Sequence, residues 1–215
     1  MHAIVAGGTG LVGGALLQLL SSDPRYRRVT ALVRREVVLP RGVTAQPVDF
    51  EHLDDLTLSD VDVAFCCLGT TRKDAGSAAA FRRVDLDYVL AFARLARRAG
   101  ATRFLLVSSI GASASSPFLY PKTKGEGEAA VAALGFRSVV IVRPSFLVGV
   151  RGRNRSGEAV ALRVSERIRP LLIGPLAKYA PIDAVVVARA LANAALEAEA
   201  GVKIIESDRI PAAAR

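Results

Sequence analysis

Short apolar runs alternate along the chain with longer stretches in which apolar residues recur every three or four positions. The short runs are typical of strands that are buried on both faces, and the longer periodic stretches are typical of amphipathic helices. The predicted strands are residues 2–6, 29–33, 43–48, 61–68, 104–107, 138–142 and 202–205. The predicted helices are residues 10–20, 76–99, 115–134, 158–168 and 183–198.

Repeated strand–helix units with buried strands predict an α/β fold, a doubly wound parallel sheet of the Rossmann class. We expect the strand order 3-2-1-4-5-6, with a seventh strand from the carboxyl-terminal part. Pro47 favours an edge position for the third strand, because proline cannot donate to a ladder. Gly100 is expected to end the helix before it. The 215 residues suit a single domain, with a core over 1–150 and a small elaboration over 151–215.

A glycine-rich segment joins the first predicted strand to the first predicted helix. Its residues are Gly7, Gly8, Thr9, Gly10, Leu11, Val12 and Gly13. Without a Cβ atom the backbone can turn tightly and let a pyrophosphate approach the amide groups at the helix N-terminus. A turn that needs glycine only for close packing is the alternative. The strand–helix context favours dinucleotide binding by these residues.

Two arginines follow the second predicted strand directly. At this point an NAD-binding domain usually has an acidic residue that accepts hydrogen bonds from the ribose 2′-hydroxyl. Arg34 and Arg35 instead offer guanidinium groups that can hold a 2′-phosphate with charge-assisted bonds. A solvated charge pair at a strand end is the alternative. We predict NADP(H) rather than NAD as the cofactor.

Tyr120 and Lys124 lie four residues apart in a predicted helix, so they share one helical face. A phenol with a pKa of about 10 is a poor acid–base group at neutral pH, and a nearby ammonium group favours its ionised form. Ser108 and Ser109 follow the preceding strand and could hold a substrate oxygen while the phenol exchanges its proton. Such a pair also occurs by chance on surface helices, but together with the glycine segment it predicts catalysis.

These motifs resemble the short-chain dehydrogenase/reductase superfamily. More narrowly, the chain is similar to the Tat-interactive protein family of atypical members over residues 3–180. The similar stretches are 48–56, 65–72, 84–89, 118–126 and Arg143-Pro144, of which the run Cys-Cys-Leu-Gly-Thr-Thr-Arg over 66–72 is the most specific.

The resemblance implies that Tyr120 is the proton donor or acceptor and that Lys124 orients the nicotinamide ribose. It leaves the serine open. The pattern of extended members favours Ser109, whereas the spacing to Gly111 favours Ser108, and we prefer Ser109 here. Asp85 stands where many relatives have asparagine, so a proton relay through this position is not carried over.

The resemblance also implies the residues around the cofactor. Leu68 and Gly69 would pass beside it at the fourth strand. Arg34, with Arg35, would take the adenosine 2′-phosphate. Asp49 would lie near the adenine, and Pro144 near the nicotinamide amide.

The net charge of +9 comes from 29 basic and 20 acidic residues and is spread along the chain, with its densest part over 151–169. There is no tryptophan, and only 6% of residues are aromatic, so platforms for stacking bases are few. We therefore expect a phosphate on a small molecule rather than nucleic acid. An uncharged stretch over 3–22 is long enough to span a bilayer, but its glycines argue against a membrane helix.

Cys66 and Cys67 are adjacent and cannot form an unstrained disulfide. We read them as buried, reduced cysteines and expect a cytoplasmic location. His2 and His52 show no ligand spacing, so we predict no metal site. We expect Glu126 and Glu128 to be solvated on the surface of their helix.

The sequence thus predicts an NADPH-dependent oxidoreductase that acts on a small carbonyl or alcohol substrate. An NADPH-sensing module that binds a protein partner without turnover is the first alternative. An epimerase or dehydratase that uses the cofactor transiently is the second. Fold and cofactor do not specify the substrate, and the sequence does not predict the oligomeric state.

Overall fold

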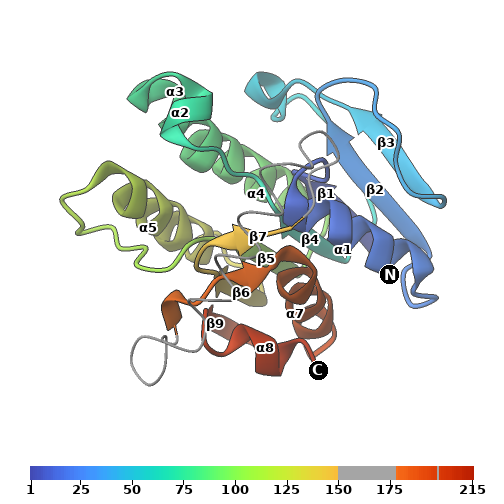
Figure 1. Ribbon diagram of the computed structural model, residues 1–215. Helices are drawn as coiled ribbons and strands as arrows, with labels where there is room; N and C mark the ends of the chain where they lie inside the picture. Colours follow the sequence, from blue (N-terminus) through green and yellow to red (C-terminus); the bar gives the residue numbers. More distant parts are fainter. Residues whose placement is uncertain (150–177, 198) are drawn as a thin grey trace.

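The computed structural model describes residues 1–149, 178–197 and 199–215. Seven parallel strands form one sheet in the order β3-β2-β1-β4-β5-β6-β9 (Figure 1). The strands are β1 (His2–Ala6), β2 (Arg28–Val33), β3 (Val43–Pro47), β4 (Val63–Cys66), β5 (Arg103–Val107), β6 (Ser138–Arg143) and β9 (Gly201–Glu206). The predicted class and strand order are confirmed. The strand that contains Pro47 lies at the edge of the sheet, as predicted.

Helices cover both faces of the sheet (Figure 1). Their bounds are α1 (Leu11–Ser22), α4 (Tyr88–Arg98), α5 (Leu119–Ala132), α7 (Ala184–Glu197) and α8 (Ile210–Ala213). Side chains alternate between the faces along each strand, so the sheet separates two apolar cores. In β5, Leu105 and Val107 pack on the side of α1 and α7, whereas Phe104 and Leu106 pack on the side of α4 and α5. No helix of the described residues is long and apolar enough to cross a membrane.

The helix predicted over 76–99 is interrupted. A short helix α2 (Arg72–Ala75) ends at Gly76, whose φ is +80°, and the hydroxyl of Ser77 then caps α3 (Ala78–Arg82) by accepting a bond from Ala80 N–H. A π-helical turn, η2 (Arg83–Asp87), follows and leads into α4. Its extra residue turns Asp85 inward, where the side chain is buried.

Other boundaries shift by a few residues. The helix predicted over 115–134 begins only at Leu119, because the preceding loop folds back so that Ser113 N–H donates to the carbonyl of Pro121. Gly100, with a φ of +99°, ends α4 as predicted. A 3-10 turn, η1 (Phe50–His52), and two short paired strands, β7 (Leu147–Val148) and β8 (Ile182–Asp183), were not predicted. The predicted helix 158–168 and the basic stretch 151–169 lie outside the described residues.

Arg143 at the end of β6 ties three elements together. Its guanidinium donates to Glu128 of α5 at 3.0 Å and to Glu206 of β9 at 2.8 Å. The bonds to Glu128 raise the pKa of Arg143 against the effect of its own burial. The expectation that Glu126 and Glu128 are solvated is wrong for Glu128, which is buried by this pairing.

We expect Arg143→Met to lower the free energy of unfolding by about 2–3 kcal/mol, because Glu128 then remains buried without its cation. Urea denaturation followed by circular dichroism measures this change. The matched control is Lys203→Met, which removes an exposed pair with Glu197 and should cost less than about 0.5 kcal/mol. Equal losses in the two variants would contradict the structural role of Arg143.

Candidate functional site

The glycine turn after β1 is built by close approach of backbones. Gly7 has a φ of +82°, and a Cβ atom there would collide with the carbonyl of Cys67, which follows β4. A Cβ atom on Gly13 would lie 2.8 Å from the carbonyl carbon of Gly7 and 2.9 Å from Cα of Gly8. Gly10 N–H donates to the Gly7 carbonyl at 3.0 Å and closes the turn. These contacts leave room only for glycine at positions 7 and 13.

The same turn leaves the N-terminus of α1 open to an anion. Gly10 is the N-cap residue, no side chain caps the helix, and the first turn holds no acidic residue. Thr9 is exposed and Leu11 is half-buried, so the mouth of the turn is accessible. Unpaired amide groups at a helix start, together with the helix dipole, favour a phosphate group. The turn from Gly7 to Gly13 therefore fits the pyrophosphate of a dinucleotide.

Arg34, Arg35 and Asp49 lie at the neighbouring carboxyl ends of β2 and β3. The Val48 N–H donates to the carbonyl of Val33 at 2.9 Å, which brings the two loops together. Both guanidinium groups are exposed, and the described residues show no ion pair to either. Asp49 accepts bonds from the Glu51 amide and from His52, and these bonds lower the pKa of its carboxyl group.

A cavity of about 450 Å³ adjoins these loops. Its lining residues are Val33, Glu36, Val37, Val38, Ala45 and Pro47. Val33 and Glu36 flank Arg34 and Arg35 in the sequence, so the cavity lies next to the two arginines.

Tyr120 and Lys124 share a face of α5, as the spacing predicts. Tyr120 is partly exposed, and its ring stacks on Phe81 with the centroids 5.5 Å apart. Lys124 is buried, and its Nζ lies 2.7 Å from Oδ1 of Asp85. Burial opposes the charged form of Lys124, but Asp85 and Tyr120 outweigh this effect and raise its pKa. The ammonium group therefore stays charged beside the phenol.

Leu68 and Gly69 pass next to this pair. Leu68 packs on the core beneath α4, and a Cβ atom on Gly69 would lie 3.5 Å from Nζ of Lys124. Nearby Cys66 is fully buried, and burial raises the pKa of its thiol to about 12. Burial likewise raises the pKa of Cys67, so neither thiol is a nucleophile at neutral pH.

The two candidate serines differ in their surroundings. Ser108 N–H donates to the carbonyl of Val142 at 2.8 Å, so Ser108 continues the β5–β6 ladder. Its hydroxyl is buried and has no partner in the described part of the chain. Ser109 is half-buried and its hydroxyl reaches only the Ile110 carbonyl, at 3.4 Å. Pro144 is buried beside them, and its carbonyl accepts a bond from Ile110 N–H at 2.9 Å.

A contact that sequence reasoning missed fixes α5 against this loop. A Cβ atom on Gly125 would lie 2.6 Å from Cα of Ser113, so helix and loop backbones touch there. This glycine is one residue from Lys124, and its position inside a helix was the available signal. Asp85 was noted but given no role, and the stacking of Phe81 on Tyr120 was not foreseen.

All these residues lie where parallel strands end, and they form two groups. The glycine turn and the loops at Arg34 and Asp49 follow β1, β2 and β3. The serines, Tyr120, Lys124, Gly69 and Pro144 lie around the ends of β4, β5 and β6. Open α/β sheets bind their ligands just outside the carboxyl ends of their strands.

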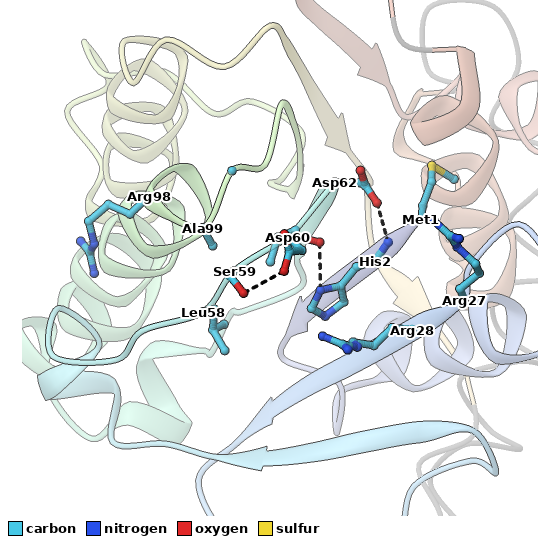
Figure 2. Close-up of a pocket in the computed structure, with 12 residues that line it drawn as sticks. Met1, His2, Arg27, Arg28, Leu58, Ser59, Asp60, Asp62, Arg98 and Ala99 are labelled. Atoms are coloured by element: carbon cyan, nitrogen blue, oxygen red, sulfur yellow. Dashed lines mark hydrogen bonds between the residues drawn. The ribbon is translucent and has the colours of Figure 1, made fainter.

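A second cavity, of about 720 Å³, lies at the other ends of the strands, where β1, β2 and β4 begin (Figure 2). There the ring of His2 bonds to the carbonyl of Asp60 at 3.2 Å and to the hydroxyl of Thr30 at 3.0 Å. Asp62 accepts the amide of His2, and Arg98 pairs with Asp54 outside the cavity. Groups of both signs thus line this cavity and no single ligand chemistry follows, so we do not assign it to the candidate site.

Comparison with known proteins identifies the family. The sequence matches the NAD(P)H-binding family over residues 7–160, a range that begins at the glycine turn and includes β6. The chain belongs to this family. The predicted dinucleotide binding is therefore confirmed at the level of NAD(P), and the site described above lies within the matched region.

Two relatives of this NAD(P)H-binding chain are informative. It is 42% identical to the protein HTATIP2 of Rattus norvegicus over 163 residues, which are 73% of this chain and 67% of that protein. It is 35% identical to the protein FMP52, mitochondrial, of Candida albicans over 193 residues, which are 86% and 83% of the two chains. The resemblance to the Tat-interactive protein family is thereby confirmed.

Solved structures confirm the fold. The human epimerase family protein SDR39U1, solved with NADPH, superposes with a TM-score of 0.66 at 20% identity and covers 98% of this chain and 77% of that one. The NAD(P)H-binding chain therefore shares its Rossmann-like fold with this NADPH-bound epimerase family protein.

The prediction of a cytoplasmic location is contradicted. FMP52 proteins from several fungi, including the relative from Candida albicans, are named mitochondrial. The prediction rested on two reduced cysteines, and these indicate only that the surroundings are reducing. They cannot distinguish one reducing compartment from another.

We expect Gly13→Ala to weaken NADPH binding at least about 10-fold and to lower stability, because its Cβ would displace the backbone of Gly7 and Gly8. Gly14→Ala is the matched control. Its Cβ would meet only the Gly8 carbonyl at 3.6 Å, and alanine favours the helix by up to about 1 kcal/mol. Fluorescence titration measures cofactor affinity and thermal melts measure stability in both variants. Unchanged affinity and stability in Gly13→Ala would contradict the close approach of Gly13 to Gly7 and Gly8.

Proposed function

We propose that the protein is an NADPH-dependent oxidoreductase that acts on a small carbonyl or alcohol substrate. The observation that carries this proposal is the grouping of Ser108, Tyr120 and Lys124 at the sheet edge where the glycine turn opens. A protein that only binds a dinucleotide has no need for a hydroxyl, a phenol and an ammonium group together.

Each side chain has a role that its surroundings support. The serine hydroxyl would hold the substrate oxygen, and Tyr120 would give its proton to that oxygen during reduction or take it back during oxidation. Lys124 would favour the ionised phenol and hold the ribose next to the nicotinamide. Reduced nicotinamide, when bound, supplies the hydride. Gly69 and Pro144 would flank the ring.

Strand alternation favours Ser108 over Ser109 for the contact with substrate. Phe104 and Leu106 face the layer of α4 and α5, and Ser108 continues this alternation on the side that carries Tyr120. A buried hydroxyl without a partner is costly, and a substrate oxygen would satisfy it. Ser109 lies beyond this last ladder bond, and its hydroxyl donates to the Ile110 carbonyl at 3.4 Å.

The arginines after β2 support NADPH rather than NADH. In the described part of the chain neither Arg34 nor Arg35 has an ion-pair partner, so both can bind a 2′-phosphate, whereas Asp49 after β3 already accepts two bonds within its own loop. A guanidinium can form two parallel bonds to phosphate oxygens. We also propose that the substrate is a small molecule. A protein partner becomes the better hypothesis only if the native protein binds NADPH but shows no turnover.

For Arg34→Ala we expect the Kd for NADPH to rise about 10- to 100-fold, because one charge-assisted contact to the 2′-phosphate is lost. The Kd for NADH should stay within about two-fold, since that cofactor has no such phosphate. Paired titrations by nicotinamide fluorescence measure both. Arg41→Ala, an exposed arginine before β3, is the control and should bind both cofactors normally. Equal weakening toward the two cofactors would argue against NADPH selectivity at this position.

For Tyr120→Phe we expect kcat to fall at least about 100-fold, while NADPH affinity stays within about two-fold. Phenylalanine keeps the stacking on Phe81 and removes only the hydroxyl. Ser108→Ala should behave similarly, and Ser109→Ala should lose much less. NADPH consumption over a panel of carbonyl compounds measures turnover. Full activity in Tyr120→Phe would refute the mechanism, whereas NADPH binding without turnover in the native protein would favour a cofactor-sensing module.

A further inference from the structure

The segment over 69–82 contacts the candidate acid–base residues at both of its ends. At its start, a Cβ atom on Gly69 would lie 3.5 Å from Nζ of Lys124. Near its end, Phe81 stacks on Tyr120 with the ring centroids 5.5 Å apart. The short helix α2 lies between these two contacts in the sequence, so both ends of the segment hold α2 close to the acid–base residues.

Two cations of α2 have no role in the chemistry described so far. Arg72 and Lys73 are both exposed, and the described residues show no ion pair to either. Three residues of chain span at most about 11 Å, so the Cα atom of Arg72 lies within that distance of Gly69. A side chain as long as that of arginine can therefore reach a molecule that is bound at Tyr120.

The carboxylates near α2 and the start of α5 already have partners. Asp85 lies 2.7 Å from Nζ of Lys124, and Glu126 lies 2.7 Å from the guanidinium of Arg82. On α2 itself, Asp74 turns back and accepts the hydroxyl of its own N-cap residue at 2.9 Å. In the described part of the chain, α2 thus carries a net positive charge that these carboxylates do not offset. Such a charge at a site attracts an anionic molecule.

We propose that Arg72 and Lys73 bind an anionic group of the substrate, a carboxylate or a phosphate, while its carbonyl group lies at Tyr120. This substrate class rests on the proposed function. A guanidinium forms two parallel bonds to either group, and the lysine ammonium adds a point charge. The pyrophosphate of the cofactor is the other anion at this end of the sheet, but the open start of α1 fits that group.

The test compares two aldehydes that share one ring and differ in charge, para-carboxybenzaldehyde and its methyl ester. In each reduction the carbonyl carbon takes a hydride from NADPH and its oxygen takes a proton, which leaves the alcohol and NADP+. NADPH consumption gives kcat/KM for both aldehydes. In the native protein the acid should be preferred about 10-fold, and added salt should reduce this ratio. In Arg72→Gln/Lys73→Gln the ratio should fall to about two-fold or less.

Arg94→Gln/Arg97→Gln is the matched control. It removes the same number of positive charges from exposed positions of α4, toward the ends at which the strands begin. We expect the control to keep the native ratio within about two-fold, because screening by salt limits the reach of exposed charges. An unchanged ratio in the α2 variant, or an equal loss in the α4 variant, would overturn the proposal.

Fluorescence titration with NADPH separates the two anions that α2 could bind. The Kd for NADPH should stay within about two-fold of native in Arg72→Gln/Lys73→Gln, because the cofactor phosphates have other partners. A Kd for NADPH that rises as much as the acid-to-ester ratio falls would assign both cations to the cofactor. That result would overturn the proposal.

Binding of the anion can also be measured without turnover. The probe is para-(hydroxymethyl)benzoate, the reduced form of the acid, which cannot react with NADPH. Saturation-transfer NMR gives its Kd for the NADPH-loaded protein, and this Kd should rise about 10-fold in the α2 variant but not in the α4 control.

This measurement distinguishes failure of the inference from failure of the proposed function. If the native protein reduces neither aldehyde but binds the anion through Arg72 and Lys73, the proposed function fails and the anion site stands. If the native protein does not bind the anion, or if the α2 variant binds it equally well, the anion site is refuted.

Discussion

The candidate site depends on the close approach of two backbones, where Gly7 lies against the carbonyl of Cys67. This contact joins the ends of β1 and β4 and turns the chain sharply into α1. The N-terminus of α1 therefore lies at the carboxyl ends of the strands, the same ends after which the serines follow β5. The glycine turn and the acid–base residues thus lie at the same ends of the strands. A side chain at position 7 would force the backbones of Gly7 and Cys67 apart.

Much of this arrangement could be predicted because it follows from local patterns. Alternating periodicity predicted the fold class, whose usual strand order is the one observed, and the spacing of Tyr120 and Lys124 predicted their common face. What could not be predicted depends on partners distant in the sequence. Glu128 looked like a surface residue until Arg143 was found beside it. The proposed preference for Ser108 needed the last ladder bond of β5, because that bond shows that Ser108, and not Ser109, continues the strand.

Charge in this protein has two separate uses. The exposed arginines after β2 keep their hydration and can exchange it for a phosphate. The buried pairs at Lys124 and Arg143 have already given up water, so their charges are fixed partners of one another. The net charge of +9 is therefore a poor guide to function, since it counts both kinds equally.

The π-helical turn at 83–87 has a consequence for the alignment of related chains. It adds one residue to a helix whose neighbours advance by about 100° each, so the positions before and after it follow different phases. Loss of one residue there would leave Phe81 on its own face of α3 but would rotate Asp85 away from Lys124. A one-residue gap in this segment would thus separate relatives that retain a balanced lysine from relatives that do not, even where Tyr120 and Lys124 are identical.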